Sequence, residues 1–76
     1  MSDNVKRLKH TLLLIERLKE NTSYSILEKN AAMHDVEQFC KTLSNPFFQN
    51  VEYHFVLTKG YEEFRAMLLE EINQVT

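Results

Sequence analysis

The chain has 76 residues, a formal net charge of −2, and a composition that is 43% hydrophobic and 26% charged. This length allows one domain at most, and a domain this small buries only a modest share of its surface. The single cysteine, Cys40, excludes an intrachain disulfide framework and favours a reducing compartment.

One glycine and one proline in the whole chain favour a helical fold, because turns and hairpins use both residues. The first helix is predicted over residues 4–20, with Asp3 or Asn4 as its cap. Its apolar residues cover about half of the helix circumference, which exceeds the stripe of about 100° that one neighbour requires. They are Val5, Leu8, Leu12, Leu14, Ile15 and Leu18. Leu13 lies on the opposite face, where a single exposed leucine is common.

The middle of the chain contains a helix-start signal, then an ambiguous stretch, then a clearer helical pattern. Ser25 and Glu28 have the spacing of a capping box, which predicts a helical turn or two over 25–30. Residues 30–33 fit a loop as well as a helix. A clearer helix is predicted over 34–44, with Val36, Phe39 and Leu43 on one face.

Asn45 and Pro46 indicate the start of a last helix over 46–75, because the fixed φ of proline suits the first helical position. Phe47, Phe48, Val51 and Phe55 would share one face. The same stretch alternates from Val51 to Thr58 as a strand would. We favour the helix because the chain offers no second strand for pairing.

Gly60 divides the predicted last helix. It could end a helix as a C-cap, or it could lie inside a longer helix at a cost of about 1 kcal/mol relative to alanine. The residues that follow form a narrow apolar seam, which is typical of a coiled-coil edge and has no obvious mate in the chain. They are Tyr61, Phe64, Leu68, Ile72 and Val75.

No residue pattern in the sequence predicts a catalytic or metal site. The three histidines are scattered, and zinc would need about four ligands. Cys40 lies among apolar residues on a predicted helix face, so packing explains it better than nucleophilic chemistry does. The Glu62–Glu63 and Glu70–Glu71 pairs fit a solvated helix face. We therefore expect neither an enzyme nor a cofactor.

The first residues contain no apolar segment ahead of a cleavage site, and no apolar run approaches the about 18 residues of a membrane span. A cytoplasmic protein without direct membrane insertion is therefore expected. Basic residues gather in the first quarter, but solvated helix faces explain them better than nucleic-acid binding does, since the chain has no basic excess. They are Lys6, Arg7, Lys9, Arg17 and Lys19.

The order of these features resembles an L27 domain, the assembly module of membrane-associated guanylate kinases and multi-PDZ polarity scaffolds. The chain contains a leucine-rich first helix, TLLLIERLKE, then FCKTLSNPFF across a helix break, then QNVEYHF. The matching residues are Leu14, Ile15 and Leu18 in the first part, Phe39 and Leu43 in the second, Pro46 and Phe48 at the break, and Val51 and Phe55 after it. Residues 21–33 are longer than the usual connection, and Gly60 interrupts the last helix.

The resemblance implies an all-α, three-helix domain, residues 1–76, that completes a four-helix bundle with another L27-like domain. The implied role is assembly of scaffold proteins at cell junctions, synapses or polarity complexes, with localisation through the parent scaffold. The expected partner interface comprises Leu8, Leu12, Ile15, Leu18, Val36, Phe39, Leu43, Phe47, Phe48, Val51, Phe55, Tyr61, Phe64, Leu68 and Ile72.

Two other functions remain open at this point. One is a free-standing helical regulator that binds and inhibits an enzyme or a transcription factor. The other is a nucleic-acid-binding domain that uses the basic residues of the first helix, which a salt-dependent shift on DNA or RNA would reveal.

Overall fold

The computed structural model describes the backbone of residues 2–75 and the side chains of residues 4–75. Its elements, in chain order, are α1 (Ser2–Glu20), α2 (Ile26–Cys40), α3 (Phe47–Asn50), the 3₁₀ helix η1 (Tyr53–Phe55) and α4 (Tyr61–Val75). Residues 2–75 contain no strand. The expected small all-α domain with three main helices is confirmed.

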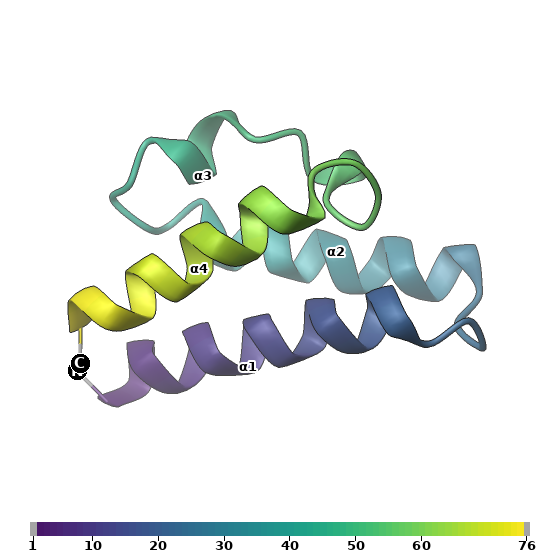
Figure 1. Ribbon diagram of the computed structural model, residues 1–76, viewed down its shortest axis with the longest axis horizontal. Helices are drawn as coiled ribbons and strands as arrows, with labels where there is room; N and C mark the ends of the chain where they lie inside the picture. The colour runs from purple at the N-terminus through teal and green to yellow at the C-terminus, as the bar shows by residue number, and fades with distance from the viewer. Residues whose placement is uncertain (1, 76) are drawn as a thin grey trace.

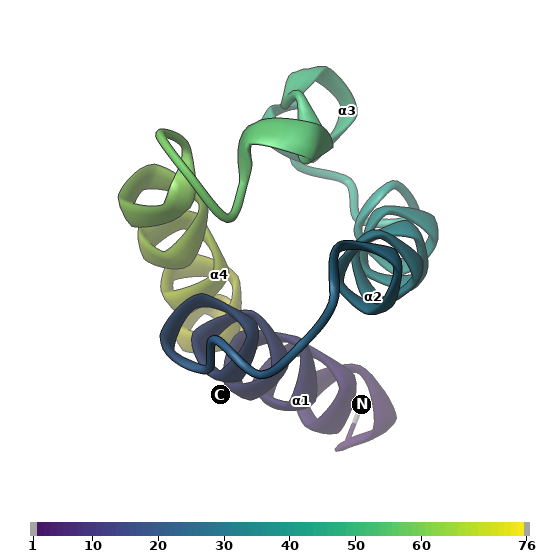
Figure 2. The same ribbon diagram turned by 90° about the vertical axis from the view of Figure 1, so that its right-hand side faces the viewer.

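Of the three long helices, α2 and α4 both pack against α1. Both α2 and α4 run antiparallel to α1 (Figure 1), and α1 contacts each of them. Viewed along the helices, α1, α2 and α4 occupy three sides of the molecule, and the segment with α3 and η1 occupies the fourth (Figure 2). A segment of the chain itself therefore covers the side between α2 and α4.

One apolar core lies between these four parts. Its buried residues are Leu8, Ile15, Leu18, Met33, Val36, Phe39, Cys40, Phe48, Tyr53, Val56, Tyr61, Phe64, Leu68 and Ile72. The ring of Phe64 lies at the centre of an aromatic cluster, 5.6 Å from the ring of Phe48 and 5.7 Å from that of Tyr53. Because these residues come from α3, η1 and α4, the cluster holds the irregular segment to the last helix.

The start of α2 agrees with the sequence, but its extent does not. The Ser25 hydroxyl accepts a hydrogen bond from the Glu28 amide at 3.1 Å, and the Glu28 carboxylate accepts one from the Ser25 amide at 2.8 Å. The predicted helix over 34–44 is too short at its beginning, because α2 continues from Ile26 without a break and ends at Cys40. The reciprocal cap starts the helix, and residues 30–33 do not interrupt it, because they include two alanines and no glycine or proline.

The predicted helix over 46–75 is wrong before residue 61. α3 has only four residues, and Val51 is extended, with φ −71° and ψ 146°. The prediction of Asn45 as the cap and Pro46 as the first helical residue is wrong by one position, because Pro46 is the N-cap of α3 and makes no side-chain cap bond. The Asn45 side-chain oxygen accepts a hydrogen bond from the Phe47 amide at 2.9 Å, in the turn before α3. The competing strand is also absent. Burial of Tyr53, whose hydroxyl donates to the Phe48 carbonyl at 2.7 Å, stabilises the tight reversal instead.

Gly60 lies at the start of α4, where neither of the predicted roles placed it. Its carbonyl accepts from the Phe64 amide at 3.1 Å, which begins the helical pattern. Its own amide donates to the Phe55 carbonyl at 2.9 Å. A Cβ atom at this position would lie 3.2 Å from that carbonyl oxygen, so the absence of a side chain permits the close approach.

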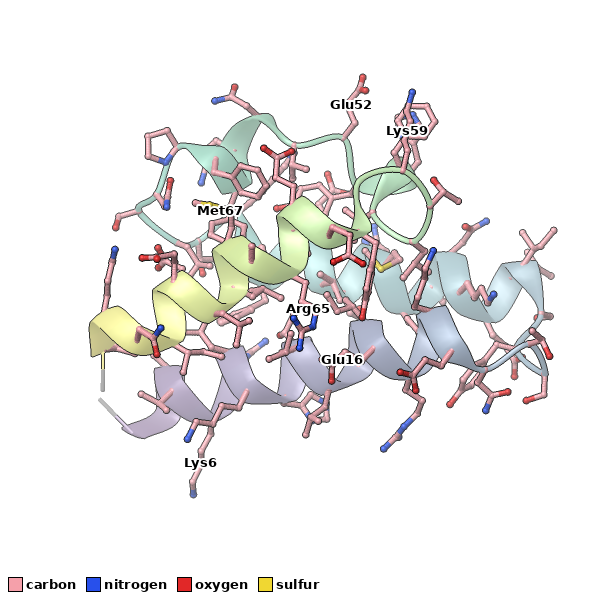
Figure 3. All side chains as sticks on the ribbon, in the orientation of Figure 1. Lys6, Glu16, Glu52, Lys59, Arg65 and Met67 are labelled. Carbon is pink, nitrogen blue, oxygen red and sulfur yellow. The ribbon has the colours of Figure 1, made fainter. Side chains whose placement is uncertain are left out.

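The apolar seam of the last helix has a mate within the chain, so the prediction that it lacks one is wrong. Tyr61, Phe64, Leu68 and Ile72 are buried against the rest of the core, while Val75 is half exposed. Polar contacts also hold α4 in place. Arg65 donates to the Glu16 carboxylate of α1 at 2.9 Å (Figure 3), and the Asn45 amide donates to Glu71 at 3.3 Å.

Candidate interaction surface

The structure places most of the expected interface residues inside the chain's own core. Those that are buried are Leu8, Ile15, Leu18, Val36, Phe39, Phe48, Tyr61, Phe64, Leu68 and Ile72. Leu12, Leu43, Phe47 and Val51 are half-buried and pack against that core, and Phe55 is half-buried as well. With α4 packed into the core as described, which we call the closed conformation, only the half-buried residues have surface that a partner could contact.

Three of the half-buried residues, Phe47, Val51 and Phe55, lie together in one groove. We call it the 47–63 groove; it has a volume of about 550 Å³. Its lining residues are Phe47, Asn50, Val51, Glu52, Phe55, Lys59, Gly60 and Glu63. The groove forms because the chain turns at Val51 and again before α4, which brings α3, η1 and the first turn of α4 around one opening.

The 47–63 groove combines aromatic walls with charges of both signs. The Phe47 ring packs edge-on against buried Phe48, with centroids 5.1 Å apart, so its position is held from the core side. The Lys59 ammonium lies 4.1 Å from the centre of the Phe55 ring, so it partly covers the apolar face of that ring. Glu52 and Lys59 both project outward from this segment (Figure 3). Such a surface can bury an apolar side chain and form ion pairs at its rim.

A second groove, which the sequence analysis missed, follows the first half of α2. Ile26 and Leu27 are the most exposed large apolar residues of the described part of the chain, at 77% and 80% of their surface. Ile26 lines a small cavity together with Met33 and Leu57. The sequence did carry a signal, since two apolar residues directly follow the capping serine, but a face for them could not be assigned without η1.

The buried thiol is protected from chemistry. Burial, and to a lesser degree the Glu71 charge, raise the pKa of Cys40 to about 12. The phenol of Tyr53 is affected in the same way, because burial and then the neighbouring Cys40 raise its pKa above the ordinary value of 10.0. Both groups are protonated near neutral pH, which suits packing and not nucleophilic attack.

Residues 4–75 offer neither a metal site nor a membrane span. Within that range no group of three or more histidine, cysteine, aspartate or glutamate side chains could hold a metal ion. No helix in the described part of the chain is long and apolar enough to cross a membrane.

The basic residues of α1 are spread over its length, and two of them contact other parts of the protein. Lys6 points into solvent (Figure 3). The Arg7 guanidinium lies 4.6 Å from the centre of the Phe39 ring, and the Lys19 ammonium donates to the Leu57 carbonyl at 3.3 Å. These contacts account for two of the basic side chains without an external partner.

No family model matches this chain, and neither a curated protein nor a solved structure matches it.

Proposed function

We propose that this chain is a protein-interaction module that recruits another protein, with another L27-like domain as the class of partner. The observation that supports the proposal is the 47–63 groove, where Phe47, Val51 and Phe55 share one opening at the surface. Aromatic residues in a pocket with a charged rim are characteristic of the centres of protein interfaces. The resemblance of the chain to L27 domains supplies the class of partner.

Two routes of assembly are compatible with this role, and they make different demands on the fold. In the four-helix route, two helices from each partner form the bundle, so the apolar faces of α1 and α2 must become free and α4 must leave α1. In the groove route, the domain stays closed and the partner inserts a side chain into the 47–63 groove. The closed core favours the groove route, because exposing Phe64 and Leu68 would forfeit their burial.

The closed core also favours a second candidate, the free-standing regulator that binds an enzyme or a transcription factor. One apolar cluster joins all four parts of the chain, so the domain has a core of its own before any partner arrives. A regulator could use the same groove. The two candidates differ in the partner and not in the chemistry of binding.

The proposal is tested by capture with the purified domain and by matched variants. Val51→Glu places a carboxylate in the groove, whereas Leu13→Glu places one on the far face of α1, where the leucine is 59% exposed. Glu63→Lys changes the groove rim, and Glu62→Lys changes the adjacent position outside it. We expect captured proteins to be lost with Val51→Glu and Glu63→Lys and kept with the two controls. Equal capture by all four variants would count against this surface.

Hydrogen exchange of the complex separates the two routes. If the partner occupies the groove, the α4 amides around Phe64 and Leu68 should keep or gain protection. If the four-helix route operates, α4 should lose protection when the partner binds, because its contacts with α1 are replaced. The nature of the captured proteins then separates a scaffold module from a regulator.

A further inference from the structure

The lining of the 47–63 groove carries more negative than positive charge. Glu52 and Glu63 contribute two carboxylates to it, and Lys59 contributes the single ammonium. All three side chains are exposed. The two ion pairs among residues 4–75 lie elsewhere, at the end of α2 and between α1 and α4. Neither carboxylate of the groove is therefore paired with a cation of the chain.

The position of Lys59 shows which wall of the groove accepts a cation. Its ammonium lies 4.1 Å from the centre of the Phe55 ring, a cation–π distance, and forms no ion pair with Glu52 or Glu63. Such a contact is weak at an exposed site, so an incoming cation can replace it. The groove thus offers an aromatic face for a positive group and two carboxylates near it.

The groove is larger than one apolar side chain requires. Its volume is about 550 Å³, whereas a cavity of about 150 Å³ holds a benzene-sized group. Phe47 and Val51 supply an apolar wall for an aliphatic side chain, and the long stem of a neighbouring basic residue can cover more of the lining. A guanidinium suits this surface well, because it stacks on a ring and donates two parallel hydrogen bonds to a carboxylate.

We propose that the 47–63 groove binds a basic segment of another protein, in which a leucine adjoins an arginine. The leucine packs against Phe47 and Val51. The arginine takes the place of the Lys59 ammonium on the Phe55 ring and pairs with the rim carboxylates. Because this groove is the interaction surface proposed above, binding of the segment rests on that function and adds the chemistry of the partner.

The test uses a fluorescein-labelled heptapeptide with a central leucine flanked by two arginines, followed by anisotropy and by amide chemical shifts of the intact 76-residue chain. Two comparison peptides carry alanine in place of the leucine, or glutamates in place of the arginines. We expect shifts confined to residues 47–63. Both comparison peptides should bind at least about tenfold more weakly, and added salt should weaken binding of the arginine peptide.

Matched variants test the charges themselves. Glu52→Gln and Glu63→Gln should each weaken binding of the arginine peptide about threefold or more, because each removes a charge that faces it. Glu62→Gln removes the same charge outside the groove and should change binding by less than about twofold. Lys59→Gln should strengthen binding about threefold, because it removes the competing cation from the Phe55 ring. Circular dichroism would verify that all four variants fold.

Three results would overturn the inference. The first is equal binding of the arginine and the glutamate peptide. The second is an equal effect of Glu63→Gln and Glu62→Gln. The third is self-association of the chain that Glu63→Gln abolishes, with no binding of the peptide, which would assign the groove to a second copy.

Val51→Glu separates this inference from the proposed function. If the arginine peptide fails to bind but Val51→Glu still abolishes capture, the groove remains the interaction surface and its partner has another chemistry. If Val51→Glu changes neither capture nor peptide binding, the proposed function fails at this groove, and the inference fails with it.

Discussion

Replacing Phe64 by alanine tests whether α4 belongs to the chain's own core. Phe64 has none of its surface exposed, and its ring contacts those of Phe48 and Tyr53 edge-on. Truncating a buried phenylalanine costs about 3–5 kcal/mol, and each aromatic pair adds about 0.5–1.5 kcal/mol beyond area burial. We therefore expect a loss near the upper end, about 4–5 kcal/mol. A domain of this length has a total stability of roughly 4–11 kcal/mol, so the variant should be marginal at best.

Urea titration followed by far-ultraviolet circular dichroism measures this loss. Leu13→Ala is the control, since Leu13 is mostly exposed and alanine preserves helix propensity; its effect should stay within about 0.5 kcal/mol. A loss below about 1 kcal/mol for Phe64→Ala, close to that of the control, would refute the packing of α4 into the core beside α3 and η1 in solution. It would favour the four-helix route instead, because α4 would then be available to a partner.

Four further outcomes follow from individual contacts. Phe48→Glu places a carboxylate at a fully buried position, so it should prevent folding and not merely partner binding. Lys9→Glu should melt as the original chain does, and a cooperative melt of Phe48→Glu would contradict the burial of Phe48. Ser25→Ala should cost about 1 kcal/mol in thermal denaturation through loss of the α2 cap, and no change would mean that the cap is not formed. Gly60→Ala should destabilise the domain, because its Cβ would press on the Phe55 carbonyl; an unchanged melting temperature would show that the turn can relax. The Cys40 thiol should resist alkylation at pH 8, and rapid labelling of the native chain would refute its burial. Because folding raises the pKa of Cys40 from 9.0 to about 12, the free energy of unfolding should fall as pH increases from about 9 to about 12, and Cys40→Ala should reduce this loss.

Local features of the chain were predictable because they depend on neighbours in sequence. The half-circumference apolar face of α1 indicated a helix that packs on more than one partner, and α1 does contact both α2 and α4. The reciprocal cap of Ser25 and Glu28 was likewise recognisable, because each of its two bonds joins residues three apart in sequence. The near absence of glycine and proline correctly indicated an all-α domain.

Tertiary structure alone decided which apolar faces meet. The seam from Tyr61 to Ile72 reads the same whether its mate is another chain or α1, because periodicity records the width of an apolar face and not what covers it. Residues 47–57 satisfy a helical pattern, yet burial of Phe48, Tyr53 and Val56 beside Phe64 replaces a continuous helix by two short pieces. The same reversal creates both grooves. A sequence of this length therefore determines its helices and caps, while the packing energy of a few aromatic rings determines which surface remains for a partner.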